Sequence, residues 1–335
     1  GLSTTSNWMA ESNQAGASFG WSVSTTGDVN GDGYDDVVVG AYLYANGQTD
    51  EGRAYVYHGS ASGLSAAAAW TGESNQTYAR FGFSVSRAGD VNGDGYDDVI
   101  VGAYLYDNGQ TDEGRAYVYH GSASGLSATA AWTAESDQAS ARFGYSVSTA
   151  GDVNNDGYAD VIIGAMGFDN GQTDEGRVYV YHGSSSGLSA TVSWTAESDQ
   201  VSASFAYSVS AAGDVDGDGY GDVIVGAPMY DNGQTNEGRA YVYHGSALGL
   251  SASVGWTAES DLANAWLGNS VFSAGDVNGD GYADVIVGVP YYANGQSGEG
   301  AAFVYHGSPP PSGTVVVDVT PDDAQWTITG PAGFS

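Results

Sequence analysis

The sequence of 335 residues contains no cysteine and no lysine, and its seven basic residues, all arginine, are outnumbered by 40 acidic ones. The lack of cysteine excludes disulfides, thiolate metal sites and cysteine nucleophiles. The lack of lysine excludes Schiff-base chemistry on a lysine side chain. The formal net charge of −33 repels phosphate groups, so we expect no nucleic-acid partner and no docking to anionic membranes.

Long apolar runs are also absent. No stretch approaches the roughly 18 apolar residues that a membrane-spanning helix needs, so we expect no membrane insertion. The chain begins at Gly1 without an initiator Met or an apolar signal segment, and we expect that it has been trimmed. The apolar content of 41% and the 24 Tyr are too high for a disordered acidic chain and indicate a folded core.

A repeat of 62 residues dominates the sequence. The motif Tyr-His-Gly-Ser occurs five times at this spacing, and so does a Trp. The residues concerned are His58, His120, His182, His244 and His306, and Trp8, Trp70, Trp132, Trp194 and Trp256. Self-similarity at a fixed period predicts a repeat architecture in which each copy forms one structural unit.

Each copy is predicted to contain four short strands and no helix. In the second copy these are Phe81–Ser86, Asp98–Ala103, Arg115–His120 and Ala128–Thr133, separated by clusters of Gly, Asn, Asp and Ser. The second strand is continuously apolar and the first and third alternate, which places the second near the middle of a sheet. Five such units predict an all-β fold, a β-propeller of five four-stranded blades over residues 1–308.

The two ends of the repeat array are offset. Gly1–Ser3 and Trp8 match the fourth-strand segment that follows each Gly-Ser, whereas the fifth copy ends at Ser308 without such a segment. We therefore predict that the ring closes by pairing of the N-terminal strand into the last blade. The alternative is an open solenoid or part of a larger ring.

A separate tail follows the last copy. Residues 309–313 are predicted to be a Pro-rich linker, and residues 314–335 the start of a further, truncated β domain or tail. Within this tail we expect one strand over Thr314–Thr320 and a second over Trp326–Gly330.

An acidic segment of nine residues separates the first two predicted strands of every copy, and in the first copy it spans Asp28–Asp36. Oxygen side chains stand at its positions 1, 3, 5 and 9, Gly stands at position 6, and position 7 offers a backbone carbonyl. This is how a loop surrounds a hard cation, and a flexible cage of six or seven oxygens suits Ca²⁺ better than Mg²⁺. We predict about five Ca²⁺, one per blade.

The predicted ligands follow the same order in each copy. They are Asp28, Asn30, Asp32, Tyr34 and Asp36; Asp90, Asn92, Asp94, Tyr96 and Asp98; Asp152, Asn154, Asp156, Tyr158 and Asp160; Asp214, Asp216, Asp218, Tyr220 and Asp222; and Asp276, Asn278, Asp280, Tyr282 and Asp284.

A metal-free explanation of the loops is a series of Asn-Gly and Asp-Gly turns. That explanation does not account for acids at both position 1 and position 9 in all five copies, because such carboxylates repel one another when no cation is present. The loop also differs from an EF-hand, in which position 12 is a bidentate Glu, since position 12 here is Val39 in a predicted strand.

Phe-Gly precedes the loop at Phe19, Phe81 and Phe143, and Gly-Ala-Pro follows it at Gly226–Pro228. Together with the loop itself, these residues resemble the FG-GAP repeat of integrin α-subunits and of bacterial surface proteins. The fourth copy has Phe205-Ala206, the fifth has Leu267-Gly268, and three copies lack the Pro. The resemblance implies a Ca²⁺-binding propeller, seven-bladed in integrins, in an extracellular adhesion or ligand-binding protein.

No residue marks a catalytic centre, and we expect no enzyme activity. All five His occupy one repeat position, and the ten Glu form two repeat series that begin at Glu11 and Glu51. We expect each His to bridge neighbouring strands by hydrogen bonds. A metal held by a ring of the five His is the less favoured alternative.

The regions that differ between copies are the candidate ligand surface. One follows the second strand, as in Tyr42–Tyr44, and another precedes the first strand, as in Leu262–Trp266. Aromatic side chains beside Asn, Gln and Asp suit stacking on sugars or contact with a protein, although the same rings can pack between blades.

We therefore predict a secreted or cell-surface adhesion or ligand-binding module with a glycan or protein ligand. The first alternative is a structural building block of a surface layer or filament, self-associating through the tail, whose strands can pair with an exposed edge. The minor alternative is a non-catalytic module of a polysaccharide-active enzyme. The excess of acids over basic residues also favours a saline habitat.

Overall fold

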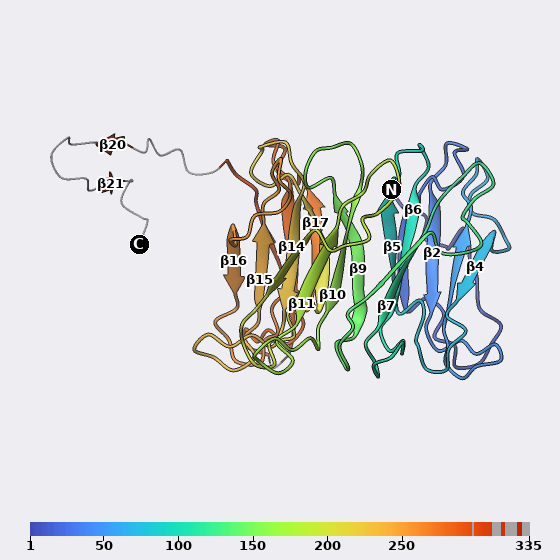
Figure 1. Ribbon diagram of the computed structural model, residues 1–335, viewed down its shortest axis with the longest axis horizontal. Coiled ribbons are helices and arrows are strands. Elements are labelled where there is room, and N and C mark those ends of the chain that lie inside the picture. The colour runs from blue at the N-terminus through green and yellow to red at the C-terminus, as the bar shows by residue number, and fades with distance from the viewer. Residues whose placement is uncertain (297, 310–315, 319–326, 330–335) are drawn as a thin grey trace.

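The computed structural model describes residues 1–296, 298–309, 316–318 and 327–329. In these ranges the chain forms β-strands and no helix, as predicted, and so it has no helix that meets the length and apolarity needed to cross a membrane. Five antiparallel sheets follow one another along the chain, and we name them the first to fifth blade (Figure 1).

The blades have the same strand order, in which each strand pairs with the next. The first contains β1 (Ser22–Gly27), β2 (Asp36–Ala41), β3 (Arg53–Tyr57) and β4 (Trp70–Glu73); the second β5 (Ser84–Gly89), β6 (Asp98–Ala103), β7 (Arg115–Tyr119) and β8 (Trp132–Glu135); the third β9 (Phe143–Gly151), β10 (Asp160–Ala165), β11 (Arg177–Tyr181) and β12 (Trp194–Glu197); the fourth β13 (Ser208–Gly213), β14 (Asp222–Ala227), β15 (Arg239–Tyr243) and β16 (Trp256–Glu259); the fifth β17 (Ser270–Gly275), β18 (Asp284–Val289) and β19 (Ala301–Tyr305).

The first strands of neighbouring blades lie side by side, β1 with β5, β5 with β9, β9 with β13 and β13 with β17. The hydrophobic cores accordingly lie in the seams between successive blades rather than within one blade. The second strands β6, β10 and β14 are buried along their whole length, which agrees with their continuous apolar sequence.

The first strand of the second blade starts at Ser84, later than predicted, whereas that of the third blade starts at Phe143, the equivalent of Phe81. Phe81 is bonded to the first blade. Its backbone N–H donates to the carbonyl of Glu51 at 2.9 Å, and it forms an isolated bridge with Gly52. The Phe81 side chain is fully buried in the seam.

Two glycines of the repeat allow the blades to approach closely. A Cβ on Gly102, in β6, would lie 2.0 Å from the carbonyl oxygen of Gly144, which follows Phe143 in the third blade. Gly144 has a φ of 81°, in the left-handed region that favours glycine. Ala206 holds this position in the fourth blade with a φ of 64°.

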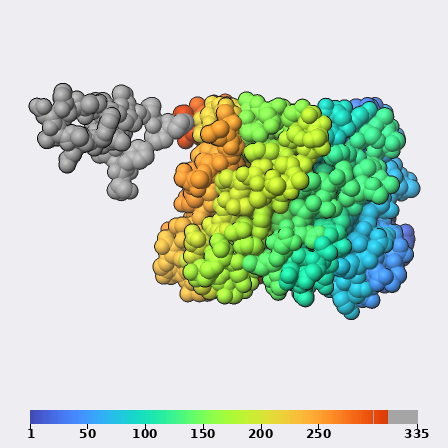
Figure 2. Space-filling view, in the orientation of Figure 1, coloured from blue at the N-terminus to red at the C-terminus, as the bar shows by residue number. Residues whose placement is uncertain are grey.

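The predicted closure of the ring is not found among the described residues. The fifth blade has three strands, and β17 is not beside β1. Val23 of the first blade is 67% exposed whereas its equivalent Val85 is 6% exposed, and Phe272 of the fifth blade is 61% exposed. Figure 2 shows the blades in chain order from one side of the molecule to the other. The described residues thus do not show closure of the ring, which remains a prediction, and the five successive sheets fit the predicted β-propeller.

Closure of the ring depends on the rotation between successive blades. That rotation depends on how the side chains of two facing sheets pack, which the number of repeats does not reveal. The N-terminal segment instead covers the first blade: the Trp8 ring meets Tyr57 at 4.8 Å, as Trp70 meets Tyr119 at 4.6 Å in the next seam.

In the tail, β20 (Val316–Asp318) pairs with β21 (Thr327–Thr329) in an antiparallel sheet. Both lie within the segments predicted to be strands. Most of residues 309–335 lie outside the described residues, so the linker at 309–313 and the further domain at 314–335 remain predictions.

Candidate functional site

Each acidic loop is organised around the aspartate at its first position. In the first blade the Asp28 carboxylate accepts hydrogen bonds from the backbone N–H groups of Gly31 at 2.7 Å, Asp32 at 3.1 Å and Gly33 at 2.7 Å. Asn30 Oδ1 also accepts from Asp32 N–H at 2.9 Å. Burial raises the pKa of the Asp28 carboxyl, but these backbone donors outweigh burial and hold it below its usual value.

The same hydrogen bonds form in the other blades. The loops that begin at Asp90, Asp214 and Asp276 repeat all three bonds to the first carboxylate. The loop that begins at Asp152 keeps the bonds to positions 5 and 6. Its position 4 is Asn155, with a φ of 54°.

The tyrosine at position 7 links one loop to the next. Tyr34 donates its backbone N–H to Asp32 Oδ1 at 3.0 Å. The ring of its equivalent in the second blade, Tyr96, lies against Gly31 of the first, where a Cβ would come within 2.6 Å of the ring. Gly31 therefore has no room for a side chain, and neighbouring loops fix each other's positions. Equivalent contacts join Gly93 to Tyr158 and Gly217 to Tyr282.

The aspartate at position 9 lies below the loop at the start of the second strand. Asp36 is fully buried and accepts backbone N–H groups of Val29 at 3.1 Å and of Gly59 at 2.7 Å, so it joins the loop to the turn after β3. Burial outweighs such bonds in the next two blades and raises the pKa of Asp98 and of Asp160 to about 7. Neighbouring loop carboxylates add to that rise.

The fourth blade shows how closely the acids approach. Carboxylate oxygens of Asp214, Asp216 and Asp218, at positions 1, 3 and 5, lie within 4.8 Å of one another. Asp222, at position 9, forms a second group with Asp216 and His244 instead. The structure thus brings together positions 1, 3 and 5, and places position 9 beneath them.

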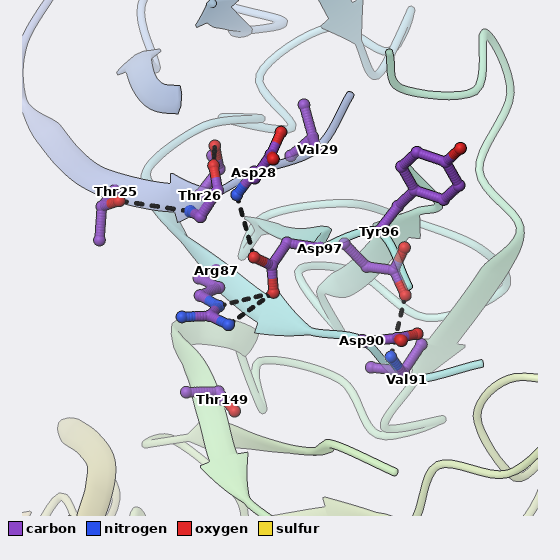
Figure 3. Close-up of polar contacts among 12 residues, drawn as sticks. Thr25, Thr26, Asp28, Val29, Arg87, Asp90, Val91, Tyr96, Asp97 and Thr149 are labelled. Carbon is purple, nitrogen blue, oxygen red and sulfur yellow. Dashed lines mark hydrogen bonds and ion pairs between the residues drawn. The ribbon is translucent and has the colours of Figure 1, made fainter. Parts of the chain in front are cut away.

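Two kinds of contact at the loops were missed from the sequence. Asp97, at position 8, accepts the backbone N–H of Asp28 at 3.0 Å and pairs with Arg87 at 2.6 Å, so it ties the first loop to the second blade (Figure 3). The other blades have Asp35, Ala159, Gly221 or Ala283 at this position, and only this pair has an Arg to signal it.

The second missed contact is made by histidine. His244 Nδ1 lies 3.3 Å from Asp216, and His306 Nδ1 lies 3.2 Å from Asp284. His120 contacts Asn92 at 3.2 Å. These His lie beside the loops of their own blades, and no metal-ligating group in the described part of the chain contains two His.

At the opposite edge of the blades, six aromatic rings form a continuous row, which we name the aromatic band. They follow the Phe-Gly position in the first four blades and the second strand in the first two blades. Successive ring centroids lie 4.5–5.4 Å apart for Trp21, Tyr42, Phe83, Tyr104, Tyr145 and Tyr207. Trp21 is 55% exposed and the others are half-buried.

Other aromatic residues of the variable stretches pack internally. Tyr44, Tyr106 and Phe168 each lie 3.9–4.0 Å beneath an Arg guanidinium of the third strand, as cation–π pairs. The variable stretches therefore contribute both to blade packing and to the surface.

Comparison with known proteins identifies the repeat. A family model described as FG-GAP repeat matches residues 19–57, 81–119, 143–181, 205–243 and 268–305, one segment in each blade. The chain belongs to the FG-GAP repeat family. This confirms the resemblance inferred from the Phe-Gly and Gly-Ala positions, and the FG-GAP segments end with the third strand of each blade.

Curated relatives carry similar FG-GAP regions. The chain is 37% identical over 179 residues to integrin alpha-V of Gallus gallus, covering 50% of this chain and 16% of the relative. It is 32% identical over 242 residues to integrin alpha-5 of Xenopus laevis, covering 70% of this chain and 22% of that relative. It is 35% identical over 207 residues to phosphatidylinositol-glycan-specific phospholipase D of Rattus norvegicus, covering 58% of this chain and 24% of that relative. The chain thus spans less than a quarter of the length of these relatives.

Proposed function

We propose that this FG-GAP array is a Ca²⁺-stabilised, non-catalytic module for adhesion or ligand binding, secreted or at a cell surface. The observation that carries the proposal is the acidic loop in each of five blades. Among the described residues, no arginine pairs with an acid at position 1 or 5 of any loop. Oxygen-rich loops whose acids at positions 1 and 5 have no arginine partner suit a hard cation.

Ca²⁺ would be held by the side chains at positions 1, 3, 5 and 9 and by the carbonyl at position 7. Once bound, it would supply the positive charge that the loops lack. Five ions would add ten charges and change the net charge from −33 to −23. Asp28 already has its carboxylate fixed by three backbone N–H groups, so little ordering of the loop would remain for the ion to induce.

The number of bound ions tests this proposal. Equilibrium dialysis against millimolar Ca²⁺ should find at least five Ca²⁺ per chain, one for each loop. Fewer than five would contradict the assignment of all five loops. Mg²⁺ at the same concentration is the control, since Mg²⁺ retains its waters and should not displace bound Ca²⁺.

For the ligand we propose a glycan or a protein bound at the aromatic band. Exposed and half-exposed rings beside polar residues offer stacking surface and hydrogen bonds at one edge of the blades. The integrin names of the relatives support an adhesion role. A glycan array, with the Trp21→Ala variant as comparison, should give saturable hits that weaken in the variant. Hits that are equally strong in the variant would place the ligand elsewhere.

A structural building block is the second candidate function. The exposed Val23 at one end of the array and Phe272 at the other favour it, because two copies could cover these faces by stacking end to end. The tail could also mediate self-association. Light scattering in Ca²⁺, with and without residues 309–335, distinguishes the candidates. Polymers without array hits would favour the building block, and a monomer with reproducible hits would favour ligand binding.

A further inference from the structure

A second type of acidic group lies in three of the seams between blades. Carboxylate oxygens of Glu113, Glu135 and Asp137 lie within 4.8 Å of one another. Glu113 precedes β7, Glu135 ends β8, and Asp137 lies in the connection to β9. The acidic loops of nine residues, which we name the nonapeptide loops, join the first strand of each blade to the second. This group therefore lies at the opposite edge of the blades. Equivalent groups are Glu175, Glu197 and Asp199, and Glu237, Glu259 and Asp261.

Glu113 carries an unpartnered oxygen into this group. Its side chain is fully buried, and its Oε1 accepts the backbone N–H of Asn108. Its Oε2 has no hydrogen-bond partner, and the same holds for Oε2 of Glu51, Glu175 and Glu237. Burying a carboxylate oxygen without a partner is costly, so four such oxygens in one fold indicate a missing binding partner, and in three of the four seams a third acid lies beside the oxygen.

The local positive charge does not balance the group. Arg115 pairs with Glu135 and stacks 4.0 Å from the Tyr106 ring, so its guanidinium is directed to one of the three acids. Asn108 Nδ2 donates to the second oxygen of Glu135 at 2.8 Å. Burial raises the pKa of Glu113, and the charges of Glu135 and Asp137 add to the rise.

We propose that each of these three seams binds one Ca²⁺ through the carboxylates of the buried Glu, the strand-end Glu and the following Asp. A divalent cation satisfies the free Oε2 and offsets the repulsion among three acids, whereas a proton would neutralise only one of them. Because Asp137 leads directly into the next blade, the ion would fasten two blades together. These seam sites are separate from the nonapeptide loops and do not depend on them.

The first seam, between the first and second blades, can be compared with the three seams that have the acidic group. In the first seam the group consists of Glu51, Glu73 and Asn75, with an amide in place of the third acid. The backbone is the same, since Asn75 has a φ of 56° and Asp137 a φ of 57°. Asparagine is therefore compatible with the fold at this position, and we expect the first seam to bind Ca²⁺ more weakly.

The test replaces the third acid in all three seams by the residue of the first seam. The triple variant is Asp137→Asn, Asp199→Asn and Asp261→Asn. The control removes three exposed acids from the same edge of the same blades and keeps an acceptor oxygen at each position. It is Asp107→Asn, Asp169→Asn and Asp231→Asn.

Equilibrium dialysis against Ca²⁺ at neutral pH should find three fewer bound ions per chain in the triple variant than in the control. The control should match the wild-type chain, and Asn75→Asp should add one ion. An equal count in the triple variant and the wild type would overturn the proposal, and so would an equal loss in the control. If the nonapeptide loops bind no Ca²⁺, the proposed function fails but the difference of three persists.

Discussion

The aspartate at position 1 of each loop has a structural task even before any ion is considered. Asp90 accepts the backbone N–H groups of Gly93 at 2.7 Å, Asp94 at 3.1 Å and Gly95 at 2.8 Å. Three donors converge on one carboxylate, and the loop backbone is thereby wrapped around it. The acid thus serves the turn as well as the proposed cation.

We expect Asp90→Asn to remove one bound Ca²⁺ and to lower stability. The amide keeps one acceptor oxygen and loses the charge, and hydrogen bonds to charged groups contribute about 1.5–3 kcal/mol each. Dialysis and denaturant unfolding in Ca²⁺ measure both effects. The control is Asp35→Asn, an exposed acid at position 8 of the first loop. Retention of every ion by Asp90→Asn would contradict the role of position 1.

The Phe of the repeat holds the seams. Phe143 is fully buried between the second and third blades, and its ring meets Tyr179 at 5.0 Å. We expect Phe143→Ala to lower the free energy of unfolding by about 3–5 kcal/mol, because the truncation leaves a cavity in a packed seam. Phe19→Ala is the matched control. Phe19 is only half-buried, so its truncation should lower the free energy of unfolding by less. Equal costs in urea unfolding would contradict this account of the seams.

Residue roles could be predicted where they repeat and not where they occur once. The ligand pattern of positions 1, 3, 5 and 9 was evident because it recurs in five copies. The Asp97–Arg87 link could not be predicted, since it requires knowing that the second loop lies beside the first. The packing of Tyr96 on Gly31 depends on the same contact between blades.

At the level of strands, the third strand of each blade presents buried tyrosines to the seam. Tyr179 and Tyr181 of β11 are examples, with exposures of 6% and 5%. Burial raises the pKa of Tyr179 to about 12, and the nearby Arg177 opposes that rise. The hydroxyl is therefore neutral in the folded chain at pH values where it ionises in the unfolded chain.

This shift predicts alkaline unfolding. Between about pH 10 and 12 the folded state keeps a proton that the unfolded state releases, so stability falls as the pH rises. Absorbance of tyrosinate during a pH titration in Ca²⁺ should rise together with unfolding. Tyr179→Phe should lose less stability over this range than the wild type. An identical pH dependence in the two proteins would show that Tyr179 does not contribute.

The kind and order of the strands followed from the sequence, whereas their limits did not, and the fifth blade has three strands rather than the predicted four. The first strand of the second blade was predicted to begin at Phe81 and begins at Ser84, whereas in the third blade it begins at the equivalent Phe143. The fourth strand was placed at 128–133 and runs from Trp132 to Glu135. Alternation of apolar residues does not encode contacts between repeats.

For the whole molecule, the repeat count predicted five blades and not whether the ring closes. The offset between the two ends of the array predicts closure, which the described residues do not show, since Val23 and Phe272 at the two ends of the array are exposed. Closure depends on the rotation at each seam, and that rotation depends on packing between sheets.

The net charge of the whole chain predicts a response to salt. With Ca²⁺ saturating, NaCl should raise the melting temperature, because screening weakens repulsion among the many acids. A neutral osmolyte at equal osmolarity is the control and should not reproduce the whole rise. No rise with NaCl would contradict the link between the acid excess and a saline habitat.

Ca²⁺ bound in the nonapeptide loops should stabilise the array, and thermal unfolding in saturating Ca²⁺ and in excess chelator measures this stabilisation. At tenfold to hundredfold saturation each ion adds on the order of 1.4–2.7 kcal/mol to the free energy of unfolding. We therefore expect a melting temperature many degrees lower in chelator, restored when Ca²⁺ is added back. Superimposable melting curves in the two conditions would contradict it.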